Sequence, residues 1–352
     1  MLAAAVALTF GLVRTAGQNL AARHMGLNFD YLSLPANFDI PFHTLPWATS
    51  DSYAWALLVA LANTLLVSAL GIVAATLLGL LVGVMRLSVN WLLRMLAASF
   101  VELVRNTPQL VQIVFWYFVV LQVLPSPRQS IMLPPGILLN IRGLYVPSLY
   151  LGPASVTLLP VAGGLLLLAV AVAFMRRVRR WAALPGLAAC GFAVASVRAI
   201  DWPVVGGFNV RGGAVVPPEL VALWLGLSIY SAAFIAEIVR GAIEAVPAGQ
   251  TEAARALGLR PRRVLLSVVL PQAVRMMVPP LTSQYLNLVK SSSLGAAIAY
   301  PELFQIFGGT VLNQSGREIE TMALLAAVFL SISLAVAVLM NWYNRRVAPI
   351  TR

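Results

Sequence analysis

The stretch that decides the fold reads EAARALG at residues 252–258, LRPRRVLLS at residues 259–267 and VVLP at residues 268–271. Residues 250–257 are mostly good helix formers, and Gly258 stands where a helix commonly ends in a left-handed turn. Pro261 suits the first turn of a second helix, because its missing N–H would have no partner there. The stretch therefore predicts two short helices joined by a tight turn.

The same stretch carries small residues in its first helix and a strong positive charge. Ala253 and Ala254 are too small to anchor a core, so we expect them on a surface that another backbone approaches closely. The basic side chains are Arg255, Arg260, Arg262 and Arg263. A charged helix-turn-helix between apolar runs is either a docking element or a solvated loop.

The composition of the chain is that of a membrane protein. Hydrophobic residues make up 60% of it and charged residues only 10%, whereas about a quarter of the residues of soluble domains are charged. Several apolar runs of roughly 20 residues are each long enough to cross a hydrocarbon core about 30 Å thick. The composition therefore predicts an all-α, polytopic helical membrane protein with about eight transmembrane helices.

The arginines set the orientation of these helices. The net charge is +12, and the arginines stand at the ends of apolar runs, which fits membrane topology and anionic lipid better than nucleic acid. Four arginines crowd residues 176–180, between apolar runs at 157–175 and 181–197. Short arginine-rich loops are cytoplasmic. This anchor places residues 252–271 and the C-terminus in the cytoplasm, and residues 14–51, 125–156 and 198–218 outside.

Some of the predicted spans are irregular. The apolar run Leu2–Val13 is shorter than the roughly 17 residues that a span needs, and we interpret it as the outer part of a first span.

Pro108 should break the run 97–124, where Glu102 and Arg105 are three residues apart and could pair. The pairs Glu237–Arg240 and Arg240–Glu244 could form at the end of the run 219–240. Pro279 and Pro280 should bend the span after residue 271, and residues 295–310 should form a broken segment.

Polar side chains inside apolar runs are candidates for a translocation path. The candidates are Asn63, Gln284, Asn287, Lys290 and Ser291. The alternative for each is a hydrogen bond between helices. An isolated charge at bilayer depth costs at least ~2.5–3.5 kcal/mol, so Lys290 should face a cavity, a partner or the membrane boundary.

The sequence offers no catalytic or metal site. His24 and His43 share one outer loop, Cys190 is the only cysteine, and the acidic residues lie mostly at the ends of spans. Lys290 is the only lysine and follows Val289, so the chain lacks the Gly-Lys-Ser/Thr of a phosphate-binding loop. We therefore expect no cofactor in this chain, and any ATP that drives it must be bound by another polypeptide.

The 252–271 stretch resembles the signature loop of ABC importer membrane subunits, which reads Glu-Ala-Ala, three residues, Gly, nine residues and Ile-x-Leu-Pro. The chain matches at Glu252, Ala253, Ala254, Gly258, Leu270 and Pro271, with Val268 in place of the isoleucine. The resemblance implies a type I importer core, in which this coupling loop inserts into a groove on a separate ATPase subunit. The docking residues that it implies are Glu252, Ala253, Ala254, Arg255, Gly258, Leu270 and Pro271.

Residues 55–120 and 220–345 are similar to the histidine, glutamine and polar-amino-acid branch of these permeases. The hairpin at 157–197 and the long outer loops look like the larger membrane subunit of general L-amino-acid permeases. The likeness divides the chain into a partial first span with an outer loop (1–54), the first part of the core (55–124), inserted loops with a transmembrane hairpin (125–218) and the rest of the core (219–352), which contains the coupling loop (245–271).

The resemblance also implies partners and a location. The partners are an ABC ATPase subunit, a second permease subunit that makes a homodimer or heterodimer, a periplasmic amino-acid-binding protein and membrane lipid, with no nucleic acid. The location is the bacterial inner membrane. Relatives often carry an acidic residue directly after the lysine of KSSSL at 290–294. Its absence here favours neutral or acidic amino acids as substrates, or a broad substrate specificity. An ion-coupled secondary transporter remains the alternative, because broken helices serve that class equally well.

Overall fold

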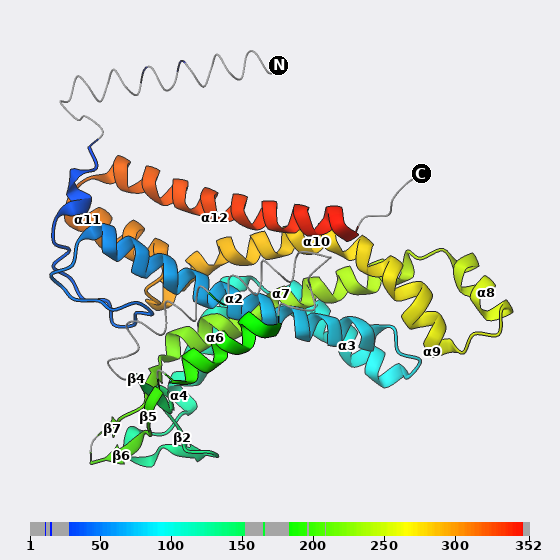
Figure 1. The fold of residues 1–352 in the computed structure, drawn as a ribbon, viewed down its shortest axis with the longest axis horizontal. Coiled ribbons are helices and arrows are strands. Elements are labelled where there is room, and N and C mark those ends of the chain that lie inside the picture. Colours follow the sequence, from blue (N-terminus) through cyan, green and yellow to red (C-terminus); the bar gives the residue numbers. More distant parts are fainter. Residues whose placement is uncertain are drawn as a thin grey trace. The chain divides into compact units, whose positions relative to one another are not determined.

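The computed structural model describes residues 28–151, 183–195, 197–207 and 209–347, together with the single positions Gly11, Thr15 and Leu165. The chain forms two compact units, one of residues 1–116 with 222–352 and one of residues 117–221. Apart from Gly11 and Leu165, the predicted runs at 2–13 and 157–175 and the basic cluster at 176–180 lie outside the described residues. Figure 1 shows the course of the described elements.

Helices make up most of the described chain and follow the apolar runs. They are η1 (Asp30–Ser33), α2 (Tyr53–Arg86), α3 (Trp91–Arg105), α4 (Gln109–Val123), α7 (Pro218–Glu244), α8 (Ala248–Ala256), α9 (Pro261–Val264), η4 (Leu265–Val269), α10 (Leu270–Ser291), η5 (Ser292–Ile298), η6 (Phe304–Val311), α11 (Leu312–Ser315) and α12 (Glu318–Val347). Within the described residues, four helical runs are long and apolar enough to cross a membrane: Tyr53–Arg86, Pro218–Glu244, Pro261–Ile298 and Glu318–Asn344. The long helix α12 lies along α10 (Figure 1).

The predicted break at Pro108 is confirmed. α3 ends at Arg105, α4 begins at Gln109, and three residues separate them. The side chain of Gln112 closes this break, because its Nε2 donates to the carbonyl oxygens of Val104 (2.8 Å) and Thr107 (3.2 Å). The Gln112 side chain thereby adds hydrogen bonds to carbonyls at the end of α3, where the regular helical partners stop. The turn between α3 and α4 is therefore held in one shape.

The expectation that the chain is all-α is wrong for the unit of residues 117–221. Its described elements are η2 (Pro127–Gln129), α6 (Ala183–Ala195) and the strands β1 (Ile131–Leu133), β2 (Ile137–Asn140), β3 (Gly143–Val146), β4 (Ser148–Leu151), β5 (Val197–Asp201), β6 (Val204–Gly206), β7 (Asn209–Arg211) and β8 (Ala214–Val216). One antiparallel sheet has the order β1-β2-β3-β8, and β4–β5 and β6–β7 form separate pairs. The segments expected to be irregular outer loops are thus partly stranded. Strands of three to five residues are too short to show a period of two clearly.

Helices α2 and α7 pack unusually closely through two glycines. A Cβ atom built on Gly79 would lie 2.6 Å from Cβ of Ile235 and 3.0 Å from the carbonyl oxygen of Ala232. A Cβ atom on Gly83 would lie 2.8 Å from Cβ of Val239. Membrane helices use small residues in this way so that their backbones can approach each other. This contact fixes α7, the helix that leads into the 245–271 loop.

We expect Gly79→Leu to destabilise the protein strongly. The larger side chain would overlap α7, and overpacking of this kind costs typically about 1–3 kcal/mol. Gly241→Leu is the matched control on α7 itself, because no part of the chain that the structure describes comes within 4 Å of a Cβ atom at Gly241. Thermal unfolding of the detergent-solubilised protein measures both. Equal stability of the two variants would contradict the close packing.

Candidate functional site

The turn after α8 has the geometry that the sequence predicts. Gly258 has a φ of +77°, a left-handed conformation that favours glycine. Its N–H donates to the carbonyl of Arg255 (2.9 Å), and the N–H of Leu259 donates to the carbonyl of Ala254 (3.2 Å). These two bonds form the Schellman motif that ends many helices. The predicted left-handed cap at Gly258 is therefore confirmed.

The second helix of the loop begins at Pro261 as predicted, but it is not a separate short helix. α9 continues through the π-helical turn η4 directly into α10, so one helical run extends from Pro261 to Ser291. The N–H of Leu270 donates to the carbonyl of Leu265, five residues back. Pro271 has no N–H to donate, which suits a widened turn just before it. The loop is therefore joined to α10 without a flexible linker.

The two alanines of the loop have different environments. Ala254 is 5% exposed and packs in a buried cluster within the chain, whereas Ala253 is exposed. The expectation that Ala254 lies on the approached surface is therefore corrected, because its face of α8 is turned inward. The other implied docking residues, Glu252, Ala253, Arg255, Gly258, Leu270 and Pro271, are exposed, as are the neighbouring Ala256 and Leu257 and the arginines Arg260, Arg262 and Arg263.

Leu257 is a residue of this surface that sequence reasoning missed. It is 81% exposed at the end of α8. An exposed leucine alone is ordinary, but this one stands beside a small exposed face of the same helix, formed by Ala253 and Ala256. Its signal in the sequence was an apolar residue directly before the capping glycine.

A continuous buried cluster connects the loop with three long helices. It contains Ala254 of α8, Val246 after α7, Ala273 of α10 and Ala75 of α2. It extends along α10 to Leu288. Because packed interiors transmit strain, a displacement of α8 would be carried into all three helices.

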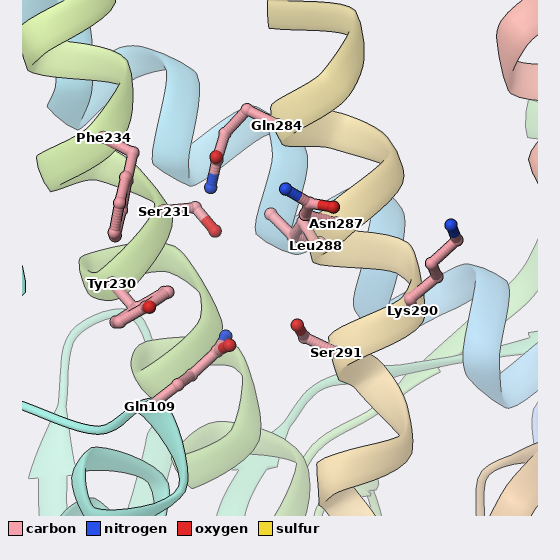
Figure 2. Close-up of a pocket in the computed structure, with 9 residues that line it drawn as sticks. All are labelled: Gln109, Tyr230, Ser231, Phe234, Gln284, Asn287, Leu288, Lys290 and Ser291. Carbon is pink, nitrogen blue, oxygen red and sulfur yellow. The ribbon is translucent and has the colours of Figure 1, made fainter.

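A cavity of about 280 Å³ lies between α7 and α10, as Figure 2 shows. Its lining residues are Gln109, Tyr230, Ser231, Phe234, Gln284, Asn287, Leu288, Lys290 and Ser291. We call it the amide cavity, after its three amide side chains. Four of the five path candidates, those on α10, are brought together here. Tyr230 and Ser231 of the opposite wall form part of the polar face of the apolar run 219–240, but they were not among the predicted path residues.

The amide cavity has unused hydrogen-bonding capacity and no acidic side chain in its described lining. Oγ of Ser231 and Nε2 of Gln109 are buried and have no hydrogen-bond partner among the residues that the structure describes. The amides of Gln284 and Asn287 lie between α10 and α7 (Figure 2). Lys290 extends away from them on the other side of α10 (Figure 2). Buried polar groups are normally paired, so these two atoms indicate a place for a polar ligand.

Asn63, the fifth path candidate, lies outside this cavity and has a structural role. Its Oδ1 accepts from the backbone N–H (3.1 Å) and the hydroxyl (3.0 Å) of Thr44. Its Nδ2 donates to the carbonyls of Phe42 (2.9 Å) and Pro301 (2.8 Å). All its hydrogen-bonding capacity is thus used. The alternative interpretation, hydrogen bonding between segments, is the correct one for Asn63.

The same region holds a buried carboxyl group, Glu302, which caps η6. Its two oxygens accept from the N–H groups of Phe304 (2.8 Å) and Gln305 (2.6 Å). Oγ1 of Thr64 on α2 accepts from Leu303 (2.9 Å). Burial raises the pKa of Glu302 to about 7, although the two backbone hydrogen bonds lower it.

We expect this carboxyl group to make stability depend on pH. Its pKa in the folded chain is above the usual 4.5, so the folded chain binds more protons than the unfolded chain between these values. The free energy of unfolding should therefore fall as the pH rises from 4.5 to about 7. Thermal unfolding across this range measures the slope, which Glu302→Gln should flatten. Glu318→Gln, on an exposed side chain, is the control, and an unchanged slope in Glu302→Gln would contradict the assignment.

Ion pairs join the inner ends of α2 and α7. Arg86 pairs with Glu237, and Arg240 pairs with both Glu237 (2.9 Å) and Glu244 (2.5 Å). The two predicted pairs of Arg240 are thus confirmed. The predicted pairing of Glu102 with Arg105 is not found; Arg105 lies over the ring of Phe234 instead. In the described part of the chain, no three His, Cys, Asp or Glu side chains are grouped so that they could hold a metal ion.

Long apolar helices, a polar cavity between two of them and a basic loop joined rigidly to one of them define a membrane transport subunit. The comparisons with known proteins agree. The family described as "Binding-protein-dependent transport system inner membrane component" matches residues 213–349. The chain is 46% identical over 352 residues to the putative amino-acid ABC transporter permease protein YhdX of Escherichia coli K12, covering 95% of this chain and 88% of the relative.

Two further comparisons point the same way. The general L-amino acid transport system permease protein AapQ of Rhizobium johnstonii is 44% identical, with 95% of this chain and 87% of the relative covered. The crystal structure of an amino acid ABC transporter with histidines aligns with 84% of this chain and 95% of its own, with a TM-score of 0.51 and 21% identity. This second likeness shows the fold alone.

The chain belongs to the family of ABC transporter permeases, the inner-membrane components of binding-protein-dependent transport systems. It is a mostly helical membrane permease and not an ATPase. Membership implies that it works with an ATPase subunit and a binding protein.

Proposed function

We propose that this chain is the membrane-spanning permease subunit of an ABC importer for polar or general L-amino acids. The observation that carries the proposal is the identity of 46% over 95% of the chain to a permease named for amino-acid transport. The amide cavity supports it, since the cavity has polar groups suited to a small, hydrogen-bonding substrate.

The lining of the amide cavity favours neutral or acidic amino acids, or a broad range of them. Its described side chains carry amides and hydroxyls but no carboxylate. A cationic side chain of a substrate would find no counter-charge there, and a buried unpaired charge is costly. The missing acidic residue in KSSSL at 290–294 argues in the same direction.

We propose the arrangement of the spans and the partner subunits on the same grounds. It comprises about eight spans, a type I core at 55–124 and 219–352, an outer part at 1–54 and inserted loops with a hairpin at 125–218. A second permease subunit would complete the path, a periplasmic binding protein would deliver the amino acid, and the ATPase partner would bind the ATP, leaving no cofactor in this chain.

The coupling loop at 245–271 would receive the movement of the ATPase subunits. The exposed docking residues would be Glu252, Ala253, Arg255, Gly258, Leu270 and Pro271, with Ala254 supporting them from inside. Because the loop continues into α10 and its buried cluster reaches Leu288, closure of the ATPases would displace the walls of the amide cavity. Such rigid transmission is a usual route to alternating access.

Filling the amide cavity tests the path. We expect Ser291→Leu to reduce the uptake of radiolabelled L-amino acids by about tenfold or more, because the side chain enters a cavity that the substrate must occupy. Ser283→Leu is the matched control, since Ser283 is exposed on the same helix and does not line the cavity. Uptake by proteoliposomes containing the whole complex measures both. Normal uptake by Ser291→Leu would remove the cavity from the path.

A further inference from the structure

A second cavity lies next to the amide cavity and shares one side chain with it. It measures about 460 Å³ and is lined by Arg86, Ala98, Val101, Glu102, Arg105, Asn106, Phe234 and Glu237. We call it the charged cavity. Among the lining residues that the structure describes, Phe234 alone borders both cavities.

The two cavities follow one another along both walls. On α7, Ser231 lines the amide cavity and Glu237 lines the charged cavity, with Phe234 halfway between them. Three residues of helix rise by about 4.5 Å, so Phe234 lies about that far along the helix axis from both Ser231 and Glu237. On the opposite wall, Gln109 lines the amide cavity and Arg105 lines the charged cavity. The break between α3 and α4 lies between these two residues.

The ring of Phe234 contacts two other side chains. Cζ of Arg105 lies 5.0 Å from the ring centroid, which is the geometry of a cation–π interaction. The ring of Tyr230 lies 4.9 Å away on the same helix. The charged cavity, in contrast, lies toward the inner ends of α2 and α7, since its lining includes Arg86, the last residue of α2, and Glu237, which pairs with Arg86 two turns before the end of α7.

We propose that Phe234 is the inner gate of the translocation path, and that Arg105 holds it closed by stacking on its ring. The gate separates the amide cavity from the charged cavity at the inner ends of α2 and α7. A shift of α7 against the end of α3 would draw the guanidinium from the ring and open the passage. This inference rests on the proposed function, because it assigns a gate to the proposed path.

Cysteine labelling tests the gate without any transport measurement. Cys190 is the only cysteine of the chain, so Cys190→Ser gives a background on which single cysteines can be placed. Ser231→Cys reports on the amide cavity and Ala98→Cys on the charged cavity. Inside-out vesicles containing the complete complex are treated with a membrane-impermeant thiol reagent, both without nucleotide and with a non-hydrolysable ATP analogue.

With Phe234 present, Ser231→Cys should react slowly in at least one of these two states. Adding Phe234→Ala should raise its rate about tenfold in that state, while the rate of Ala98→Cys stays the same. Phe234→Tyr should keep Ser231→Cys slow, and Arg105→Met should raise its rate while leaving the ring in place. The unchanged rate of Ala98→Cys also shows that the variants are folded around the charged cavity.

Equal reactivity of Ser231→Cys with phenylalanine and with alanine at position 234, in both states, would overturn the gate. A rate that rises with Phe234→Ala but not with Arg105→Met would overturn the role of Arg105 alone. The labelling needs neither substrate nor hydrolysis, so it distinguishes failure of the gate from failure of the proposed function. A chain that shows the gate but imports no amino acid would contradict only the latter.

Discussion

Gly258→Val should abolish ATP-driven uptake while the chain still inserts in the membrane. The φ of +77° at Gly258 is strained for any residue with a Cβ atom, at a cost of roughly 1–2 kcal/mol, and more so for a β-branched one. No atom of the described residues lies within 4 Å of a Cβ atom at this position, so we attribute the effect to the backbone conformation. The Schellman turn would open, and α8 would lose its fixed orientation to α10.

Gly258→Asn is the matched control for this effect. Asparagine tolerates the left-handed region far better than valine, so this variant should retain much of the uptake. Uptake is compared in proteoliposomes at equal amounts of inserted protein. Normal transport by Gly258→Val would count against the assigned role of the turn.

The second large effect is expected at the exposed end of α8. Leu257→Glu should prevent co-purification of the ATPase subunit, because it would place a charge in an apolar contact. Central residues of an interface often contribute about 2 kcal/mol or more, which is roughly a thirtyfold change in affinity. Leu257 is 81% exposed, so the fold of this chain should not change.

Two controls accompany Leu257→Glu. Leu257→Met keeps the contact apolar and should keep the ATPase subunit bound. Val89→Glu introduces the same charge at a residue that is 97% exposed in the loop between α2 and α3, and it should leave the ATPase subunit bound as well. Retention of the ATPase subunit by Leu257→Glu would exclude this end of α8 from the docking surface.

Features that depend on a few neighbouring residues could be predicted from the sequence. The helix α2, the break at Pro108 and the left-handed turn at Gly258 follow from local hydrophobicity, from a missing N–H and from the absence of a Cβ atom. The polar residues of α10 were found for a similar reason. A polar side chain in an apolar run has few alternatives to facing another helix.

Features that depend on distant partners could not be predicted. The strand β3 pairs with β8, which lies about 70 residues further along the chain. The role of Asn63 depends on the carbonyl of Pro301. Ala254 is turned inward because a cluster from three other helices meets it. In each case the deciding atoms belong to segments whose proximity no local pattern reveals.

The central claim is that the 245–271 loop receives the movement of a separate ATPase. The most direct test of this claim is the energy source of uptake. Proteoliposomes containing the purified complex and its binding protein are loaded with ATP, or given a proton or sodium gradient without ATP. We expect amino-acid uptake with internal ATP alone and none with either gradient alone. Uptake driven by a gradient in the absence of ATP would contradict the account and favour an ion-coupled secondary transporter.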